Sequence, residues 1–444
     1  MGLFVQGRGY DKEVRGRRRV EKGRAGGGKM NEKLKDFLTI DDFELEGKTV
    51  LFRADINSVI IDGQVQMKER IEENAKTIQE LSDKKAKVVI LAHQGRAGQA
   101  DFLPLEQHAQ LLRNFMELKY IDDIIGPTAR DAIKGLDPGE VLLLDNVRML
   151  AEETLDKTPE EHSKSIFVHR LAPLADIYIN DAFSVAHRSH ASVVGFPKVL
   201  NAGIGRLMER ELVALERAVY QIKSPCIYIL GGVKPEEVFD IMNVTLMRKK
   251  VDTILTTGAL GTLFLYASGT IEPGEEEKAD EHFMKNVEQA KRFLEIGKDV
   301  IEYPEDVAVA VDGERKEIPV EQLKPNQPAY DIGRKTSEKY SERIRNARTV
   351  IMKGPAGFYE KKAFAEGTRD IFEAIADSDA FSLLGGGHTS AAISEVGIDR
   401  KRMANIHVSL AGGAFLRYFV DKHLPGIEVL KNLSFKKKAL PKKY

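Results

Sequence analysis

Tryptophan is absent from this chain of 444 residues, and cysteine occurs only once, as Cys226. A single cysteine cannot close a disulfide within the chain, which excludes a small extracellular fold held together by disulfides. Cys226 lies in the apolar run PCIYIL, so we expect a small buried strand residue there rather than a reactive thiol.

Long apolar runs and an excess of charge are missing as well. No run approaches the roughly 18 residues of a membrane-spanning helix, and no signal-peptide core is present. The 67 basic and 68 acidic side chains leave a formal net charge of -1, whereas general nucleic-acid binders usually carry a strong basic excess. We therefore expect a cytoplasmic enzyme with no membrane or nucleic-acid partner.

The chain is long enough and apolar enough for two domains. Its residues are 42% hydrophobic, and its length exceeds the roughly 250 to 300 residues at which single cores stop growing. Short Val/Ile/Leu runs alternate with helical periodicity, which indicates parallel strands covered by helices on both faces. We expect strands over residues 49–52 and 87–91 and helices over 70–81 and 361–376, with a long helix over 202–220 joining the domains.

The first 29 residues differ in composition from the rest. Nine lysine or arginine side chains stand there against three acidic ones, and the glycine run 26–28 closely precedes Met30. Such a composition predicts disorder. We favour an over-extended start, with Met30 as the true first residue, over a basic arm that binds RNA or a membrane.

The residues that follow the predicted strands differ between the two halves of the chain. In the first half they include arginine and histidine, in VLFRADIN, VVILAHQGR, VLLLDNVR and IYINDAFSVAHRSH. Guanidinium groups bind phosphate or carboxylate oxygens in pairs, so this half suits a small, strongly anionic substrate. In the second half they are glycines, in IYILGGVK, TILTTGAL, VIMKGPAG, FSLLGGGH and IHVSLAGG. Glycines let backbone N–H groups approach nucleotide phosphates, and two such sites indicate a transfer between them.

Eight short strings of this chain occur, in this order, in one known family: RADIN, AHQGR, LLLDNVR, NDAFSVAHRSHAS, ILGGVK, DIGRKT, KGPAGFYE and LLGGGH. The chain resembles the phosphoglycerate kinases over nearly all of its length from Met30 onward. HQGR in place of HLGR, and GGGH in place of GGGD, are similar to the archaeal branch. The resemblance implies an α/β fold of two Rossmann-like, doubly wound parallel-sheet domains joined by a hinge helix.

The resemblance also implies an activity and a division of the chain. A phosphoryl group would pass reversibly and in line from 1,3-bisphosphoglycerate to ADP after domain closure, giving 3-phosphoglycerate and ATP, with Mg²⁺ carried as Mg-ATP or Mg-ADP. Residues 1–29 would be the basic extension, and 30–203 the 3-phosphoglycerate domain. Residues 204–418 would hold the hinge helix and the nucleotide domain, and 419–444 would return to the first domain. A monomer or a homodimer is expected.

Carried over residue by residue, the resemblance places Asp55 and Asn57 at the hydroxyl and carboxylate end of the glycerate. Arg70, in KERI, matches the catalytic arginine that neutralises charge on the phosphoryl group in flight. No general base is needed, because the acceptor oxygen is already anionic. For His187 and His190 a purely structural role stays open. The residues expected to bind this substrate are Arg53, Asp55, Asn57, Arg70, His93, Arg96, Arg148 and Arg188.

The second half is expected to hold the nucleotide. Lys234 would reach the transferred group, Gly258 and Leu260 would form part of the adenine pocket, and Glu360 would bind the ribose. The catalytic set implied by the resemblance is Arg70, Lys234, Gly387 and Gly412. The nucleotide-binding set is Gly231, Gly232, Lys234, Gly258, Pro355, Glu360, Gly386, Gly387, His388 and Thr389. No residue is assigned as a metal ligand.

Four positions depart from the common pattern of the family. Val238 stands in place of a second lysine, Lys353 replaces an asparagine, and Leu410 and Ala411 stand where STGGG has threonine and glycine. These departures bear on rate and nucleotide preference. Two alternatives therefore stay open: a degenerate paralogue that binds nucleotide or phosphoglycerate without turnover, and a nucleic-acid-associated protein acting through its basic arm. Arg70 and Lys234 argue against the first, and the near-neutral charge argues against the second.

Overall fold

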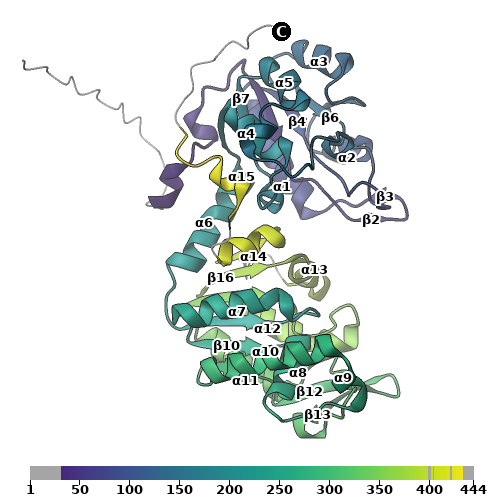
Figure 1. Ribbon diagram of the computed structural model, residues 1–444, viewed down its shortest axis with the longest axis vertical. Helices are drawn as coiled ribbons and strands as arrows, with labels where there is room; N and C mark the ends of the chain where they lie inside the picture. Colours follow the sequence, from purple (N-terminus) through teal and green to yellow (C-terminus); the bar gives the residue numbers. More distant parts are fainter. Residues whose placement is uncertain (1–31, 399–401, 404, 421–422, 434–444) are drawn as a thin grey trace, which may run out of the picture.

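The computed structural model describes residues 32–398, 402–403, 405–420 and 423–433 (Figure 1). Two α/β domains lie one above the other in this view, with α6 (Arg206–Tyr220) between them. The predicted extension over 1–29, the proposed start at Met30 and the tail over 434–444 lie outside the described residues. Within the described ranges, no helix is long and apolar enough to cross a membrane.

The N-terminal domain is built on a parallel sheet of six strands. The strands, in their order across the sheet, are β5 (Lys119–Ile121), β6 (Val141–Leu144), β4 (Lys87–Leu91), β1 (Thr49–Arg53), β7 (Ile177–Asn180) and β8 (Asn201–Ile204). The helices of this domain are α1 (Glu69–Asp83), α2 (Glu106–Leu112), α3 (Pro127–Lys134), α4 (Pro159–His162) and α5 (Ile166–Leu171). A short antiparallel hairpin joins β2 (Ile60–Ile61) to β3 (Gln64–Val65).

Helices cover both faces of this sheet because successive strand residues point to opposite sides. Val50 and Phe52 of β1 share a buried apolar cluster with Ile71 and Ile78 of α1. Leu51, between them, belongs to a second cluster that includes residues of α3 and α5. The continuous apolar strands predicted from the sequence are therefore buried on both faces, as parallel strands usually are.

The C-terminal domain repeats this plan with a second parallel sheet of six strands. Its order is β11 (Ile301–Glu302), β10 (Thr253–Thr256), β9 (Cys226–Leu230), β15 (Thr349–Lys353), β16 (Phe381–Gly385) and β17 (Ile406–Ser409). A small antiparallel sheet of β12 (Asp306–Val311), β13 (Glu314–Pro319) and β14 (Asp331–Ile332) stands beside it. Cys226 begins β9 and is buried, as the sequence predicts.

Helices also cover both faces of the second sheet. Ile227 and Ile229 of β9 share one cluster with residues of α11 and α12, and Tyr228 shares another with residues of α7, α8 and α10. The helices are α7 (Glu236–Arg248), α8 (Gly258–Ala267), α9 (Glu275–Ala279), α10 (Glu281–Gly297), α11 (Arg334–Arg345), α12 (Glu366–Asp377), α13 (Gly387–Val396), α14 (Gly413–Phe419) and α15 (Pro425–Glu428). The predicted two-domain, doubly wound α/β fold is confirmed.

Each sheet has a point where the strand order reverses. It lies beside β1 and β7 in the first domain and beside β9 and β15 in the second. In open α/β sheets the loops at the carboxyl ends of such strands form a crevice in which ligands bind. The arginine motifs follow β1 and β7, and the glycine motifs follow β9 and β15, so both sets lie where a binding site is expected.

The hinge helix α6 is tied to the N-terminal domain by ion pairs. Arg206 pairs with Asp41 at 2.6 Å and with Glu80 of α1 at 2.7 Å, and within α6 it pairs with Glu209 at 3.0 Å. The hydrogen bonds from Arg206 lower the pKa of Asp41 to about 2. One turn later, Arg210 pairs with Glu73 of α1. These ion pairs therefore hold the first half of α6 against the N-terminal domain.

Two helix boundaries were predicted wrongly. The helix expected over 202–220 begins only at Arg206, because residues 201–204 form β8 and pair with β7. The helix expected over 361–376 begins at Glu366, after a single 3₁₀ turn over Lys362–Phe364. In the first place, pairing with β7 overrides the helical pattern. In the second, the 3₁₀ bonds from Phe364 N to Lys361 O and from Ala365 N to Lys362 O precede the α-helix.

The described end of the chain returns to the N-terminal domain. The backbone N–H of Gly426, in α15, donates to Ala186 O at 2.9 Å, and that of Asn432 donates to Asp36 O at 2.7 Å. Figure 1 shows α15 beside the upper domain. The chain thus leaves the N-terminal domain through α6 and contacts it again at α15 and Asn432.

Candidate functional site

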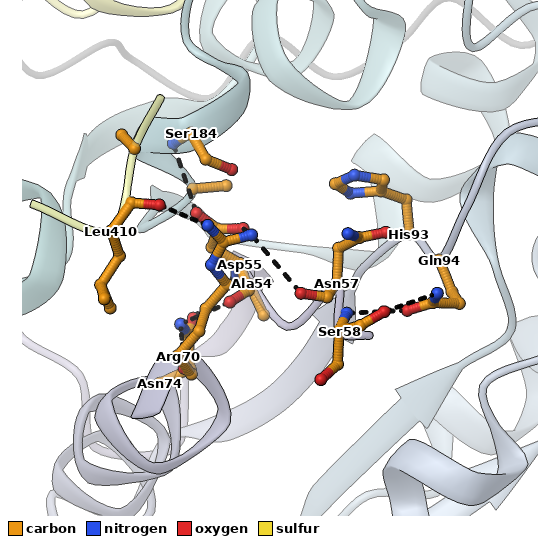
Figure 2. Close-up of polar contacts among 12 residues, drawn as sticks. Ala54, Asp55, Asn57, Ser58, Arg70, Asn74, His93, Gln94, Ser184 and Leu410 are labelled. Carbon is orange, nitrogen blue, oxygen red and sulfur yellow. Dashed lines mark hydrogen bonds and ion pairs between the residues drawn. The ribbon is translucent and has the colours of Figure 1, made fainter. Parts of the chain in front are cut away.

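The loop after β1 carries the first group of polar side chains (Figure 2). Asn74 of α1 fixes this loop, because its side chain accepts from Asp55 N and donates to Asp55 O, both at 2.9 Å. Asp55 is buried and accepts from Ser184 N at 3.3 Å. Arg70, one turn before Asn74 on α1, reaches Asp55 Oδ1 at 3.4 Å. The Asp55 carboxylate therefore orients the Arg70 side chain beside the loop after β1.

A buried glutamine connects this loop to the loop after β4. Gln94 accepts from Ser58 N at 2.9 Å and donates to Ser58 O at 3.0 Å, as Figure 2 shows. Beside it, Asn57 Oδ1 accepts from Gly95 N at 2.8 Å. The sequence marked Gln94 only as a feature of the archaeal branch and gave it no role. The contacts show that it holds two loops in register.

Arg53 is fully buried at the end of β1. Its Nε donates to Ser192 Oγ at 2.8 Å, and Ser192 Oγ in turn donates to Glu153 Oε1 at 2.6 Å. Its Nη2 lies 3.0 Å from His93 Nδ1. Because a guanidinium can only donate, Nδ1 accepts, and His93 Nε2 carries the ring hydrogen. This agrees with the pKa of His93, which burial and nearby Arg53 hold well below its usual value.

The arginines beyond His93 lie close enough together to lower one another's pKa and so form a positive cluster. Burial, with Arg188 and Arg53 nearby, lowers the pKa of Arg148 to about 10. Burial and Arg96 lower the pKa of Arg188 as well, and Arg188 Nε has no hydrogen-bond partner among the described residues. Positive groups held together against their mutual repulsion are suited to a multiply charged anion.

A cavity of about 780 Å³ opens onto this cluster, and we call it the arginine cavity. It brings together six of the eight residues predicted to bind the small substrate. Arg53 and Asp55 do not line it, because both are buried behind it and hold His93 and Arg70 in place. The predicted residues that line it are Asn57, Arg70, His93, Arg96, Arg148 and Arg188.

A second cavity, of about 1150 Å³, opens at the carboxyl ends of β9, β15 and β16, and we call it the glycine cavity. Close backbone contacts shape it. A Cβ on Gly354, which has φ +86°, would lie 2.3 Å from Gly231 O, so only glycine fits. Thr389 Oγ1 accepts from Gly354 N and donates to Gly385 O, both at 3.0 Å, which ties the loops after β15 and β16 together.

All ten residues of the predicted nucleotide set line the glycine cavity, and so does Gly412. Leu260 does not line it. That side chain is fully buried in the core, and its neighbours Ala259 and Leu263 face the cavity instead. Aromatic rings that the sequence did not single out lie at the wall of the cavity, among them Tyr330 and Phe358, which stack with ring centroids 6.1 Å apart.

The loop between β17 and α14 connects the two cavities. Arg70, which lines the arginine cavity, donates to Leu410 O. Two residues later, Gly412 and Gly413 line the glycine cavity, and a Cβ on Gly413 would lie 3.3 Å from His187 Cε1. Side chains of the first domain therefore touch a loop that forms the wall of the second cavity.

Carboxylate and histidine side chains also line the glycine cavity, among them Glu237, Asp280 and His388. Within the part of the chain that the structure describes, no three His, Cys, Asp or Glu side chains are arranged to hold a metal ion. The cavities instead supply arginine, lysine and backbone N–H donors, which bind phosphate groups.

Two doubly wound domains, one with an arginine cavity and one with a glycine cavity, define a two-domain kinase that acts on a small anionic substrate. The comparisons with known proteins agree. The sequence profile of the phosphoglycerate kinase family matches residues 40–422. The chain belongs to the phosphoglycerate kinase family and is an enzyme with that activity.

Similar proteins cover most of the chain. A phosphoglycerate kinase of Methanopyrus kandleri is 42% identical over 404 residues, which are 89% of this chain and 98% of that protein. One of Methanobacterium bryantii is 43% identical over 410 residues, covering 90% of this chain and 98% of that protein. The crystal structure of phosphoglycerate kinase from Pyrococcus horikoshii matches with a TM-score of 0.81 and 39% identity, covering 88% of this chain and 98% of that one. The resemblance to the archaeal branch is thus confirmed.

Proposed function

We propose that the chain transfers a phosphoryl group reversibly between 1,3-bisphosphoglycerate in the arginine cavity and ADP in the glycine cavity. The observation that carries this proposal is the loop over residues 409–413, which Arg70 of one cavity contacts at Leu410 and which lines the other cavity with Gly412 and Gly413. In the forward direction the bond between phosphorus and the acyl oxygen breaks, and a bond forms to a β-phosphate oxygen of ADP. The products are 3-phosphoglycerate and ATP, and no proton needs to move.

The arginine cluster holds the phosphate that is not transferred. Arg96, Arg148 and Arg188 supply positive charge, and His93 Nε2 donates one hydrogen bond from a neutral ring. Because buried Arg53 contacts His93 and Arg148 donates to Gly95 O, the glycerate is held in one register and its acyl phosphate points toward the 409–413 loop. Arg70 then neutralises charge on the phosphoryl group in transit.

The glycine cavity binds the nucleotide. Backbone N–H groups at the start of α13 and the ammonium group of Lys234 meet its phosphates, and Glu360 binds the ribose. The aromatic side of the cavity accepts the adenine ring. Both cavities lie in separate domains, so the domains close to align the two ligands and exclude water.

Magnesium fits this site as part of the nucleotide. The described residues offer no cluster of oxygen ligands for the ion, whereas phosphate oxygens and water are the ligands it prefers. When bound, magnesium supplies charge neutralisation at the phosphates. His388 is exposed at the start of α13, and we propose that it contacts phosphate rather than the ion.

No observation favours a degenerate paralogue, because Arg70 and Lys234 both line the cavities that turnover requires. A cytoplasmic location, a monomeric or homodimeric state and the lack of a nucleic-acid or membrane partner stay predictions. The proposal is tested by measuring the phosphorylation of 3-phosphoglycerate by Mg-ATP, with product removed by a coupled reductive dephosphorylation. Binding of both ligands without turnover would refute it in favour of the degenerate reading.

A further inference from the structure

Lys353 is the last residue of β15 and lies in the wall of the glycine cavity. Only 13% of its side chain is exposed, so the aliphatic stem is buried and the ammonium group points to a defined place. A Cβ on Gly386 would lie 3.5 Å from Lys353 Nζ. The charge of Lys353 therefore stands directly beside the loop that begins α13.

Glu237, in the first turn of α7, is the partner of this lysine. Its Oε2 lies 3.1 Å from Lys353 Nζ, and its Oε1 lies 3.9 Å from Lys234 Nζ. One carboxylate thus stands between two lysines that come from the ends of neighbouring strands, β9 and β15. Both lysines and Glu237 line the glycine cavity.

This carboxylate occupies a place that is built for an anion. Two ammonium groups converge on it, and the backbone at Gly386 and Gly387 lies beside them. A terminal phosphate carries more charge than a carboxylate and has more acceptor oxygens, so it is the stronger partner for two lysines. Glu237 is 44% exposed, which leaves its side chain room to turn outward.

We propose that Glu237 acts as an internal anion between Lys234 and Lys353, and that the terminal phosphates of the nucleotide displace it and bind both lysines. The inference rests on the proposed function, because it concerns the same site. Without nucleotide, Glu237 pairs with the ammonium group of Lys353, whose side chain is only 13% exposed. With nucleotide, Lys353 becomes the second phosphate-binding cation of the cavity, a role for which Val238 is unsuited because it is buried in the core.

Two substitutions with opposite expected effects test this competition. Lys353→Met keeps the stem and removes the charge, and we expect it to weaken ATP binding at least tenfold. Glu237→Gln removes the competing charge, and we expect it to strengthen ATP binding about threefold or more. Both effects should be much smaller for AMP, which lacks the terminal phosphates. Isothermal titration calorimetry with ATP and with AMP measures them in the full chain.

Controls separate this inference from general damage. Lys339→Met removes a lysine of α11 that is 37% exposed, pairs with Glu302 and Glu305 and does not line the glycine cavity, and it should leave ATP binding unchanged. Lys353→Arg keeps the charge and should bind ATP within about threefold of the unaltered chain. The affinity for 3-phosphoglycerate should be the same in every variant.

The inference is overturned if Lys353→Met binds ATP as tightly as the unaltered chain, or loses ATP and AMP affinity equally. It is also overturned if Glu237→Gln weakens ATP binding, since the carboxylate would then support the site rather than compete for it. Failure of the proposed function looks different, because the unaltered chain itself would then fail to phosphorylate 3-phosphoglycerate.

Discussion

Arg70 of the N-terminal domain donates a hydrogen bond to the carbonyl oxygen of Leu410 in the C-terminal domain (Figure 2). The backbone of Leu410 is also held at its N–H, which donates to Glu211 Oε1 of the hinge helix at 3.0 Å. One residue therefore joins the arginine of one domain, the hinge helix and the loop that leads into the glycine cavity. Leu410 thus connects the hinge helix α6 to Arg70, which lines the arginine cavity.

Replacing Arg70 with alanine should lower the rate of phosphoryl transfer roughly a thousandfold or more. Arg70 supplies the positive charge that lies between the two cavities. Among the described residues, it is the arginine that α1 contributes to the arginine cavity. Steady-state kinetics in both directions measure the effect. Arg343→Ala, which removes an exposed arginine paired with Glu302, is the matched control and should keep the full rate. A loss of less than tenfold with the fold intact would remove Arg70 from its catalytic role.

The molecule should become more compact when both ligands are bound. The two cavities belong to different domains, and transfer requires the reacting atoms to come into contact without water between them. Small-angle X-ray scattering should show a smaller radius of gyration with 3-phosphoglycerate and a non-hydrolysable ATP analogue together than in the free chain. Each ligand alone is the control. Equal radii in all four states would speak against closure.

His388→Asp should lower the magnesium concentration needed for half-maximal rate. A neutral imidazole is a poor ligand for magnesium, whereas a carboxylate beside the phosphates supplies a preferred oxygen. Magnesium titrations at fixed nucleotide concentration, run on both forms, measure the change. An unchanged or weakened magnesium dependence in the aspartate variant would show that His388 does not occupy the place beside the nucleotide-bound ion.

Stability should depend on pH through Asp181, a fully buried residue between β7 and α6. Its Oδ1 accepts from Met208 N at 2.9 Å, and burial raises its pKa from 3.8 to about 7. Because the folded pKa lies above the unfolded one, the folded chain holds more protons between about pH 4 and pH 7. The contribution of Asp181 to stability therefore falls as the pH rises through this window.

Asp181→Asn keeps an acceptor for Met208 and removes the titration. At pH 8 we expect this variant to be more stable than the unaltered chain by roughly 1 kcal/mol or more, since each pKa unit corresponds to about 1.4 kcal/mol. At pH 4 the advantage should disappear. Urea unfolding at both pH values measures the difference. Asp131→Asn, at an exposed carboxylate, is the control, and an advantage for Asp181→Asn that is equal at both pH values would contradict the raised pKa.

Much of the fold follows from short-range patterns. The apolar runs at residues 49–52 and 87–91 and the periodicity over 70–81 each correspond to an element of the structure. The start of the hinge helix was missed because residues 201–204 are a strand only through their pairing with β7. Strand pairing across the chain leaves no signal in so short a segment.

The two candidate sites, like the fold, could be predicted only in part from the sequence. Motif positions located the residues that line both cavities, because the carboxyl ends of parallel strands meet at one edge of a sheet. The support behind them could not be predicted. Glu153 contacts Ser192, which is 39 residues away in the sequence, and Lys353 contacts Glu237, which is 116 residues away. In the sequence alone, these four residues look like ordinary polar or charged surface residues.

The stereochemical course at the transferred phosphorus tests the central claim most directly. The purified chain would be given 3-phosphoglycerate and ATP made chiral at the γ-phosphorus with oxygen isotopes, and the configuration of the product phosphate would be determined. A single in-line transfer between two ligands held in facing cavities predicts turnover with net inversion. Net retention would require a phosphorylated enzyme intermediate, and either that result or an absence of turnover would contradict direct transfer between the arginine and glycine cavities.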